Sequence, residues 1–411
     1  MIHHPSPTKK PHFHRGKTQF FIPTRKDRFF SSIIVSETMA HGWVLVLVLI
    51  SVHLTLAPAY PEHVAIAGFP VNAPTASPPL SNLLPSEDDD LQYEFYRDKC
   101  PEAENIVRST MARILLLDGR KNATPEVLRL LFHDCFIQGC DASVLLDNNG
   151  NKNYSVEKDA IPNKTLKAFN LIDIIKQELE NACPGTVSCA DILVLATRDA
   201  TVLAGGPFYP ILTGRKDSRS SYFAEALSDI PRPDGSISET LRLFSRRGFS
   251  TREIVALLGA HNIGRISCEF IEPRLHNFLG TGLPDQTMPA DFLNEMTVIC
   301  SDKQSNSSNT VESAMGISYN PELLSSVSSG SVFGTQYYQS LLRGRGLLFA
   351  DQQLMANKET ADLVRAYASD DGTTFRLDFS RAMMKMSNVG VLTGSRGEVR
   401  LNCSRILLGS N

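Results

Sequence analysis

The chain lacks several patterns, and each absence removes a class of protein. Its eight cysteines include no Cys-x-x-Cys pair, which argues against a zinc finger or zinc ribbon. The most apolar stretch, from Trp43 to Ala57, has fifteen residues, too few for an ordinary membrane-spanning helix. The net charge of −3 at pH 7 gives no strong excess of either sign, so a surface for nucleic acid or anionic lipid is not indicated.

Histidine is scarce in the region where a folded body is expected. Seven of the ten histidines precede residue 64, and only His133, His261 and His276 follow. Tryptophan is absent from that region too, because the single tryptophan is Trp43. Two of the three imidazoles lie in motif-like helical segments, which invites the hypothesis that one binds a haem iron and the other acts on its opposite face.

The first ninety residues differ in composition from the rest. We expect residues 1–38, which are basic and rich in proline, serine and histidine, to be an unstructured N-terminal extension. Residues 39–59 fit a signal peptide, and residues 60–90, rich in proline, alanine and serine, fit a linker or propeptide. Whether Met1 or Met39 is the start stays open, since a start at Met1 would also allow a signal anchor or an organelle-targeting leader.

Residues 91–411 form the expected folded domain, and helical periodicity dominates them. Thr124 is expected to cap a helix that ends at Phe136, and Ser250 with Glu253 forms a capping-box pattern before another. Strand signals are few and short. We therefore expect a mostly helical domain, with helices over Ala103–Leu117, Thr124–Phe136, Leu166–Asn181, Ser188–Ala204 and Ser250–His261.

All eight cysteines lie after residue 99. An even number fits four disulfides in an exported protein. The residues alone leave the pairing open, and they also leave open eight reduced thiols in a cytosolic enzyme.

Arg129 and His133 are four residues apart in one expected helix, so they share a face with Phe132 beside them. A core histidine beside a salt-bridged arginine would explain this pair as well as a ligand site does. A hard oxygen set suited to calcium follows the pair, formed by Asp134, Asp141, Ser143 and the main-chain oxygens between them.

Several short segments between residues 91 and 403 combine into one ordered pattern. They are Phe95-Tyr96-x-x-x-Cys100-Pro101, Arg129-x-x-x-His133-Asp134-Cys135, Val187-Ser188-Cys189-Ala190-Asp191, Gly259-Ala260-His261, Gly390-x-Leu392-Thr393-Gly394 and Arg400-Leu401-Asn402-Cys403. Each motif alone is a weak signal, but together and in this order they resemble the plant secretory haem peroxidases, the class III family. The resemblance implies a mostly α, two-lobed helical haem peroxidase fold with minor short strands. It also implies four disulfides, Cys100–Cys183, Cys135–Cys140, Cys189–Cys403 and Cys268–Cys300.

The resemblance implies a role for each site residue. On the proximal side, His261 would bind the haem iron and Asp351 would accept its other N–H. On the distal side, His133 would act as the base, and Arg129 would stabilise the charge that develops as the O–O bond breaks. The remaining matches are Asn163, which would orient the distal imidazole, Phe132, which would line the haem site, and Pro231, which would lie where aromatic donors dock.

Calcium is implied on the distal side and doubtful on the proximal side. The distal ligands would be Asp134, Ile137, Gly139, Asp141 and Ser143, with Glu157 behind them. The proximal set has lost two carboxylates and reads Asn262, Ser326, Ser329 and Gly334 where oxygen donors are expected. Affinity for calcium depends on the number of carboxylates. We therefore expect calcium on the distal side alone, with a proximal histidine that is less firmly positioned.

The function implied by the resemblance is hydrogen-peroxide-dependent oxidation of phenolic or similar aromatic donors through ferryl haem intermediates, with haem b and calcium as cofactors. The resemblance also implies a secreted glycoprotein of the cell wall or vacuole that acts in the response to oxidative stress. We expect a monomer without a nucleic-acid partner or a stable membrane span, glycosylated at Asn122, Asn153 or Asn306. The alternatives are a catalytically weak or silent haem-binding cell-wall relative and an intracellular ascorbate-type peroxidase, which the eight cysteines disfavour.

Overall fold

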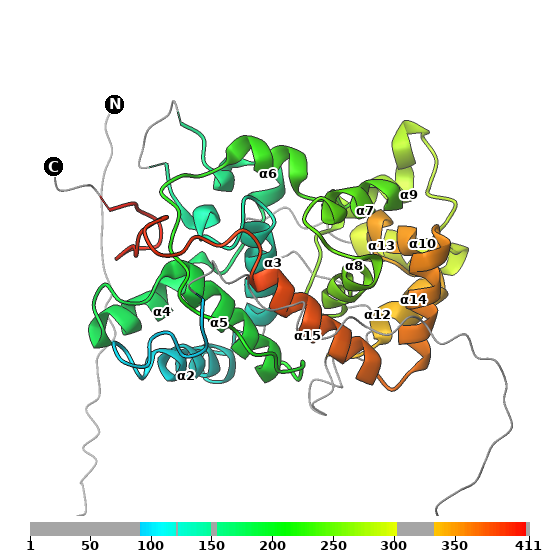
Figure 1. Cartoon of the computed structure of the whole chain (residues 1–411). Helices are drawn as coiled ribbons and strands as arrows, with labels where there is room; N and C mark the ends of the chain where they lie inside the picture. The colour runs from blue at the N-terminus through cyan, green and yellow to red at the C-terminus, as the bar shows by residue number, and fades with distance from the viewer. Residues whose placement is uncertain (1–90, 121, 149–153, 302–332, 408–411) are drawn as a thin grey trace, which may run out of the picture. The chain divides into compact units, whose positions relative to one another are not determined.

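The computed structural model describes residues 91–120, 122–148, 154–301 and 333–407 (Figure 1). Several expectations concern residues outside these ranges: the extension at 1–38, the signal peptide at 39–59, the linker at 60–90, Asn153, Asn306, Ser326 and Ser329. Within the described ranges the chain is mostly helical, and β structure is limited to isolated bridges such as that of Gln92 with Thr213. The expected mostly α fold is confirmed, with single bridges in place of short strands.

A first group of helices surrounds α5. The group consists of α2 (Ala103–Leu116), α3 (Ala123–Cys135), α4 (Phe169–Ala182) and α5 (Cys189–Leu203). The other three helices all pack against α5, and every residue of α5 from Cys189 to Thr201 is buried. A helix covered on all sides needs an apolar surface all round, and α5 has one from Ile192 to Ala196, while its buried Arg198 and Asp199 pair at 2.9 Å.

A second group of helices packs around α8 and α15. It consists of α7 (Ile237–Ser245), α8 (Thr251–Leu258), α12 (Gln336–Leu342), α14 (Lys358–Ser369) and α15 (Thr373–Ser387). Helix α15 packs along α8 and also contacts α3, so it joins the two groups (Figure 1). A small separate core lies between α9 (Glu272–His276) and α10 (Ala290–Ser301).

The remaining helical segments are short. The α-helical ones are α6 (Phe223–Asp229) and α13 (Phe349–Gln352). The 3-10 turns are η2 (Ser143–Leu145), η3 (Glu157–Asp159), η4 (Ile161–Asn163), η5 (Gly259–Asn262), η6 (Cys268–Phe270), η7 (Phe278–Gly280) and η9 (Gln353–Met355). Five of them, η2, η3, η4, η5 and α13, carry candidate site residues.

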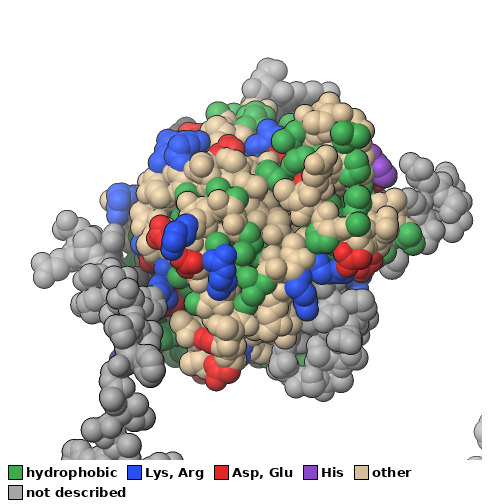
Figure 2. Space-filling view, turned by 90° about the vertical axis from the view of Figure 1, so that its right-hand side faces the viewer, with side chains coloured by type: hydrophobic (Ala, Val, Ile, Leu, Met, Phe, Trp, Pro, Cys, Tyr) green, Lys and Arg blue, Asp and Glu red, His purple; other side chains and the backbone are tan. Residues whose placement is uncertain are grey.

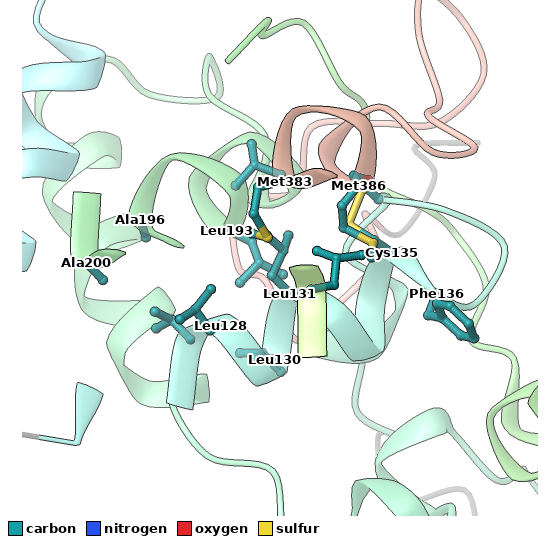
Figure 3. Close-up of a cluster of buried hydrophobic side chains, with 14 of the residues drawn as sticks. Leu128, Leu130, Leu131, Cys135, Phe136, Leu193, Ala196, Ala200, Met383 and Met386 are labelled. Atoms are coloured by element: carbon teal, nitrogen blue, oxygen red, sulfur yellow. Dashed lines mark hydrogen bonds between the residues drawn. A yellow bond between two sulfur atoms is a disulfide. The ribbon is translucent and has the colours of Figure 1, made fainter. Parts of the chain in front are cut away.

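The main core lies where α3, α5 and α15 meet (Figure 3). Leu128 and Leu131, nearly one turn apart on α3, come together there with Leu193 of α5 and Met383 of α15. Burial of each such side chain contributes about 1.5–3 kcal/mol. This junction therefore fixes α3, whose last turn carries His133, against the helix at the centre of the first group.

Helix caps follow the sequence pattern at two starts and depart from it at a third. Ser188 caps α5, and Ser250 with Glu253 forms the expected capping box at α8. The cap expected at Thr124 is wrong, because α3 already includes this residue and its hydroxyl donates to the main-chain oxygen of Ala200 at 3.1 Å. A contact with the neighbouring helix uses the hydroxyl that the pattern assigned to capping.

All eight cysteines form disulfides. The pairs are those implied by the resemblance, Cys100–Cys183, Cys135–Cys140, Cys189–Cys403 and Cys268–Cys300. The turn closed by the second pair packs on the backbone that follows α15. Gly139 and Gly390 meet there so closely that a Cβ atom on either would collide with the backbone of the opposite segment.

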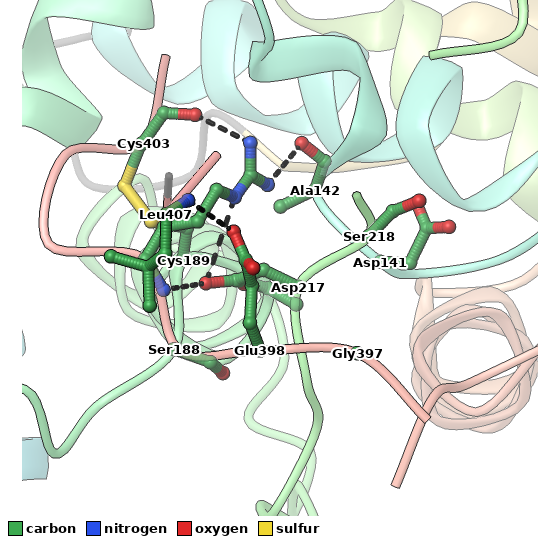
Figure 4. Close-up of polar contacts among 12 residues, drawn as sticks. Asp141, Ala142, Ser188, Cys189, Asp217, Ser218, Gly397, Glu398, Cys403 and Leu407 are labelled. Atoms are coloured by element: carbon green, nitrogen blue, oxygen red, sulfur yellow. Dashed lines mark hydrogen bonds and ion pairs between the residues drawn. A yellow bond between two sulfur atoms is a disulfide. The ribbon is translucent and has the colours of Figure 1, made fainter. Parts of the chain in front are cut away.

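A buried arginine anchors the C-terminal segment (Figure 4). The guanidinium of Arg400 donates to the main-chain oxygens of Cys403 at 2.7 Å and Ala142 at 2.6 Å. Its main-chain N–H donates to Asp217 at 2.9 Å, and Asp217 also accepts the N–H of Ala190 at the start of α5. These bonds connect the C-terminal segment, α5 and the loop before η2.

A second buried pair, Asp191 with Arg215, connects α5 to the start of the domain. The two side chains are fully buried and lie 2.7 Å apart. The other Asp191 oxygen accepts the hydroxyl of Tyr96 at 2.6 Å and the N–H of Gly214 at 2.7 Å, while Arg215 also donates to the main-chain oxygen of Ser387. A buried ion pair is stable when its remaining donors and acceptors are satisfied in this way.

The described surface agrees with the near-neutral charge of the chain. The face in Figure 2 shows basic and acidic side chains interspersed with apolar ones, without a broad area of one sign. Among the helices that the structure describes, none has the length and apolar character that crossing a bilayer requires.

Tyr96 predicts how stability depends on alkaline pH. Burial, and next the charge of Asp191, raise the pKa of Tyr96 well above 10.0. As the pH rises past about 10, the unfolded chain releases this proton before the folded one does, so the stabilisation present below that pH is progressively lost. Tyr96→Phe should cost about 1–3 kcal/mol near neutral pH, and its unfolding free energy should fall less between about pH 9 and pH 11.

The measurement is urea denaturation across that pH range. Tyr93→Phe is the control, since Tyr93 is 51% exposed and carries the same chemical change. Parallel pH profiles for the parent and Tyr96→Phe would show that the Tyr96 hydroxyl does not contribute in this way.

Candidate active site

His133 is buried in the last turn of α3, with 4% of its surface exposed. Its Nδ1 lies 2.6 Å from Oδ1 of Asn163 in η4. The amide nitrogen of Asn163 donates to the main-chain oxygen of Glu157 at 2.8 Å, so the amide oxygen must face the histidine. A carbonyl oxygen only accepts, so Nδ1 carries the hydrogen and Nε2 is left as the basic nitrogen.

The surroundings of His133 keep its ring neutral. Burial, and next the charge of Arg129, lower the pKa of His133 to about 3, although the hydrogen bond to Asn163 opposes both. Neutral imidazole is the form that can accept a proton.

Arg129 lies one turn before His133 on the same face of α3, as expected from their spacing. Its guanidinium donates to the main-chain oxygen of Pro162 and to the hydroxyl of Thr165, each at 3.0 Å. Its charge acts on both His133 and His261. The arginine is therefore placed where it influences both histidines.

Phe132 and Pro231 have less specific surroundings. Phe132 packs edge-on against the His133 ring at 5.7 Å and lies parallel to Phe244 at 5.7 Å. Pro231 is half-buried in the loop before α7. That loop is joined to the α13 segment by a hydrogen bond from the N–H of Ala350 to the main-chain oxygen of Pro233 at 3.0 Å.

His261 lies in η5, directly after α8, and it pairs with Asp351 of α13. The His261 Nδ1 lies 2.8 Å from Oδ1 of Asp351, whose side chain is 1% exposed. Burial lowers the pKa of His261, but the charge and hydrogen bond of Asp351 raise it to a net value above 6.5. Because Nδ1 donates to the carboxylate, Nε2 is the nitrogen that can bind a metal.

His261 and Arg129 are both accessible, although protein atoms surround each of them. The side chain of His261 is 43% exposed and Arg129 is exposed as well, yet burial lowers the pKa of both groups. A nitrogen that can bind a metal, together with a cation and a neutral imidazole, would suit a bound haem and its iron.

The expected distal calcium ligands lie around the loop after α3. Asp134 accepts the N–H of Ala142 at 3.0 Å, and Asp141 accepts the N–H of Ser143 at 3.0 Å. Ile137 and Gly139 are buried in the same loop. Within the described residues no three His, Cys, Asp or Glu side chains form a metal-holding group. The expected set has only two direct carboxylates, so the other ligands would be a hydroxyl and carbonyls.

The charge of this loop suits a cation. Burial raises the pKa of Asp141 to about 6 and that of Glu157 to about 8, and burial and neighbouring carboxyl groups raise the pKa of Asp134. The Ser143 hydroxyl lies near enough to Glu157 to lower the pKa of its carboxyl group. The hydroxyl oxygen and Oε2 of Glu157 are both buried, and neither has a hydrogen-bond partner among the described residues. The other oxygen of Glu157 accepts the N–H of Tyr222 at 3.0 Å.

The proximal calcium set contains protein contacts in place of ligands. Asn262 is buried, and its Oδ1 accepts the N–H of Tyr337 at 3.0 Å. At Gly334, the position of one lost carboxylate, a Cβ atom would meet the side-chain oxygen of Gln336. Ser326 and Ser329 lie outside the described residues.

Sequence reasoning missed the partners that hold the site residues. Thr165 and Pro162 bind Arg129, and Tyr337 binds Asp351 through its hydroxyl at 3.0 Å. In the sequence, the stretch around Tyr337 stands out only for Gly334, the position of a lost carboxylate. Two adjacent tyrosines in that helix were a signal for buried hydroxyl partners, since a buried tyrosine hydroxyl usually finds one.

Residues 105–370 match the family model of the peroxidases. A protein of Arabidopsis thaliana provisionally named Peroxidase 48 is 45% identical over 77% of this chain and 83% of its own length. Peroxidase 49 of Arabidopsis thaliana is 40% identical over 76% of this chain and 89% of its own length. The lignin-forming anionic peroxidase of Nicotiana tabacum is 39% identical over 77% of this chain and 93% of its own length. The chain therefore belongs to the class III plant peroxidase family, whose members are haem enzymes that act on hydrogen peroxide.

Proposed function

We propose that this peroxidase holds haem b through His261 and uses hydrogen peroxide to oxidise phenolic or similar aromatic donors. The observation that carries the proposal is the matched orientation of two imidazoles. His133 and His261 each use Nδ1 for a hydrogen bond to an oxygen, which leaves Nε2 of each free for chemistry. Bound haem would supply the reduction of peroxide and the one-electron oxidation of donors.

The distal residues would move one proton and stabilise one charge. Nε2 of His133 would accept a proton from hydrogen peroxide and return it to the departing oxygen, which leaves as water. Arg129 would stabilise the negative charge on that oxygen with N–H groups beyond those that bind Pro162 and Thr165. Asn163 would hold the His133 ring in the required tautomer.

The proximal residues would set the electron donation of the iron ligand. Asp351 is buried and accepts the Nδ1–H of His261. A carboxylate at this position makes the imidazole a stronger donor to a metal at Nε2. His261 would therefore bind the haem iron more strongly than an imidazole without such a partner.

An apolar rim beside Arg129 supports aromatic donors. Ile161 is 80% exposed and precedes Pro162, whose carbonyl binds Arg129. Pro231 is half-buried and would contribute to the docking of the donor. The tobacco relative is named for lignin formation, which supports donors of the phenolic class.

Export of the protein fits its covalent structure. Four disulfides form among the described residues, as is usual in oxidising compartments. We therefore propose a signal peptide at residues 39–59 and a mature domain from residue 91 that functions as a secreted monomer.

The absorption spectrum of the purified holoprotein before and after one equivalent of hydrogen peroxide tests the proposal. A haem spectrum that changes on mixing and returns when a phenol is added is the expected result. Haem absorption that peroxide leaves unchanged would instead support a silent haem-binding relative.

His261→Ala is expected to lose haem, because the variant lacks the nitrogen that would bind iron. The measurement is the ratio of haem absorbance to protein after gel filtration. His276→Ala is the matched control, since His276 is exposed at the end of α9 and lies outside the site. Full haem content and a parent-like spectrum in His261→Ala would remove His261 from its assigned role.

His133→Ala is expected to keep its haem but to react with hydrogen peroxide more slowly, by roughly 10²–10⁴-fold. The reason is the loss of the group that moves the proton during O–O cleavage. Stopped-flow absorbance at increasing peroxide concentration gives the second-order rate constant. A rate constant equal to that of the parent would contradict the role of His133.

A single calcium ion per chain is expected to remain after exhaustive dialysis against calcium-free buffer. It would be held by the distal loop, where the buried carboxyl groups of Asp134 and Asp141 would be direct ligands and that of Glu157 would lie behind them. Metal analysis relative to haem is the measurement, and Asp141→Asn should lower the retained amount. Two calcium ions per haem would show that the proximal ligand set still binds its ion.

A further inference from the structure

A tyrosine hydroxyl shares the carboxylate that orients the proximal histidine. The hydroxyl of Tyr337 donates to Oδ1 of Asp351 at 3.0 Å. The same Oδ1 lies 2.8 Å from Nδ1 of His261. The other oxygen of Asp351 accepts the N–H of Leu348 at 3.2 Å. The Asp351 oxygen that faces His261 thus accepts hydrogen bonds from both His261 and Tyr337. The Tyr337 hydroxyl can be removed by substitution with phenylalanine.

We propose that Tyr337 is a positioning residue that limits how strongly His261 donates electrons to the haem iron, by sharing the Asp351 oxygen that accepts the His261 N–H. The inference rests on the proposed role of His261 as the iron ligand. It adds to that role a residue whose effect on the metal is indirect and whose direction can be stated.

The direction follows from hydrogen bonding to a carboxylate. Each donor stabilises the negative charge of the carboxylate and makes its oxygens weaker acceptors. A weaker acceptor at Oδ1 of Asp351 draws the Nδ1 proton of His261 less strongly, so the ring has less imidazolate character. Less imidazolate character means weaker donation from Nε2 and a less stabilised ferric state. The Tyr337 hydroxyl therefore opposes the effect of Asp351.

The Tyr337 side chain is held firmly enough to make this contact in a single geometry. Its ring is fully buried and packs edge-on against the ring of Tyr338, with the ring centres 5.1 Å apart. The ring centres of Tyr337 and His261 are 6.2 Å apart, and the two ring planes are nearly perpendicular at 84°. Its main-chain N–H donates to Oδ1 of Asn262, the residue that follows His261. Hydrogen bonds thus connect His261 to Asp351, Asp351 to Tyr337, and Tyr337 to Asn262. Because Asn262 is bonded to His261 along the chain, these contacts form a closed path.

This closed path consists of protein atoms alone. Asn262 stands where a calcium ligand was expected, and its amide oxygen binds the start of α12 directly. The segment after His261 is therefore tied to Tyr337 without a metal ion. This contact would position the segment after His261 even if the proximal calcium is lost.

Tyr337→Phe tests the inference, because it removes one oxygen and keeps the packed ring. In the ferrous holoprotein, the iron–histidine stretching band in the resonance Raman spectrum should shift to higher frequency. The midpoint potential of the ferric–ferrous couple should shift to a more negative value. Both shifts report stronger donation by His261.

Tyr338→Phe is the matched control. Tyr338 is the neighbouring residue of α12, is also fully buried, and donates its hydroxyl to the main-chain oxygen of Val255 at 2.9 Å rather than to Asp351. Its removal should leave the Raman band and the potential at the parent values. Equal shifts in the two variants would attribute the effect to helix packing and overturn the proposal.

A second variant covers the case in which Tyr337→Phe does not yield folded holoprotein. Replacement of Tyr337 by 3-fluorotyrosine makes its hydroxyl a stronger donor, so the Raman band and the potential should move in the opposite directions. A band that does not move in either variant would overturn the role of Tyr337. A parent protein with no iron–histidine band would instead count against His261 as the ligand, so the two failures are distinguishable.

Discussion

The buried ion pair between Asp191 and Arg215 is the contact on which the rest of the described domain depends. Asp191 is at the start of the central helix α5, and its two oxygens accept from Tyr96, Gly214 and Arg215. Arg215 in turn donates to Ser387 at the end of α15. One fully buried carboxylate thus connects the beginning, the middle and the end of the domain. Removal of either charge would leave the other buried and unpaired, which typically costs 3–5 kcal/mol.

That polar framework allows two histidines to be held in different electrostatic states. A neutral amide fixes Nδ1 of His133, while a carboxylate fixes Nδ1 of His261. The pKa of His133 falls to about 3 and that of His261 rises, although both rings have the same tautomer. Two imidazoles of the same chemistry are thereby suited to two tasks, a neutral base and an electron-rich ligand. The choice of the oxygen behind each ring decides which task it can perform.

Local signals predicted the helices well, and long-range contacts explain what was missed. Ser188 and Ser250 cap their helices because the accepting hydroxyl oxygen and the main-chain N–H that donates to it are only three positions apart. Thr124 did not, because its hydroxyl meets a main-chain oxygen 76 positions away on α5. In the candidate site, the resemblance identified the pairing of His261 with Asp351, and the third member, Tyr337, became visible only when α12 was in place. A motif records the residue types of a site, whereas the sharing of one oxygen by two donors depends on folded geometry.

The η4 segment has a consequence for covalent modification. Asn163-Lys164-Thr165 has the form of an acceptor for N-linked glycans. In the folded chain, both polar ends of the Asn163 amide are engaged, and the Thr165 hydroxyl accepts from Arg129. The two residues that define this sequon are thus the two that hold His133 and Arg129. Asn163 is 3% exposed, so a glycan on its nitrogen would fit only if the amide moved away from Glu157 and His133. The folded active site and a sugar at this position therefore exclude each other.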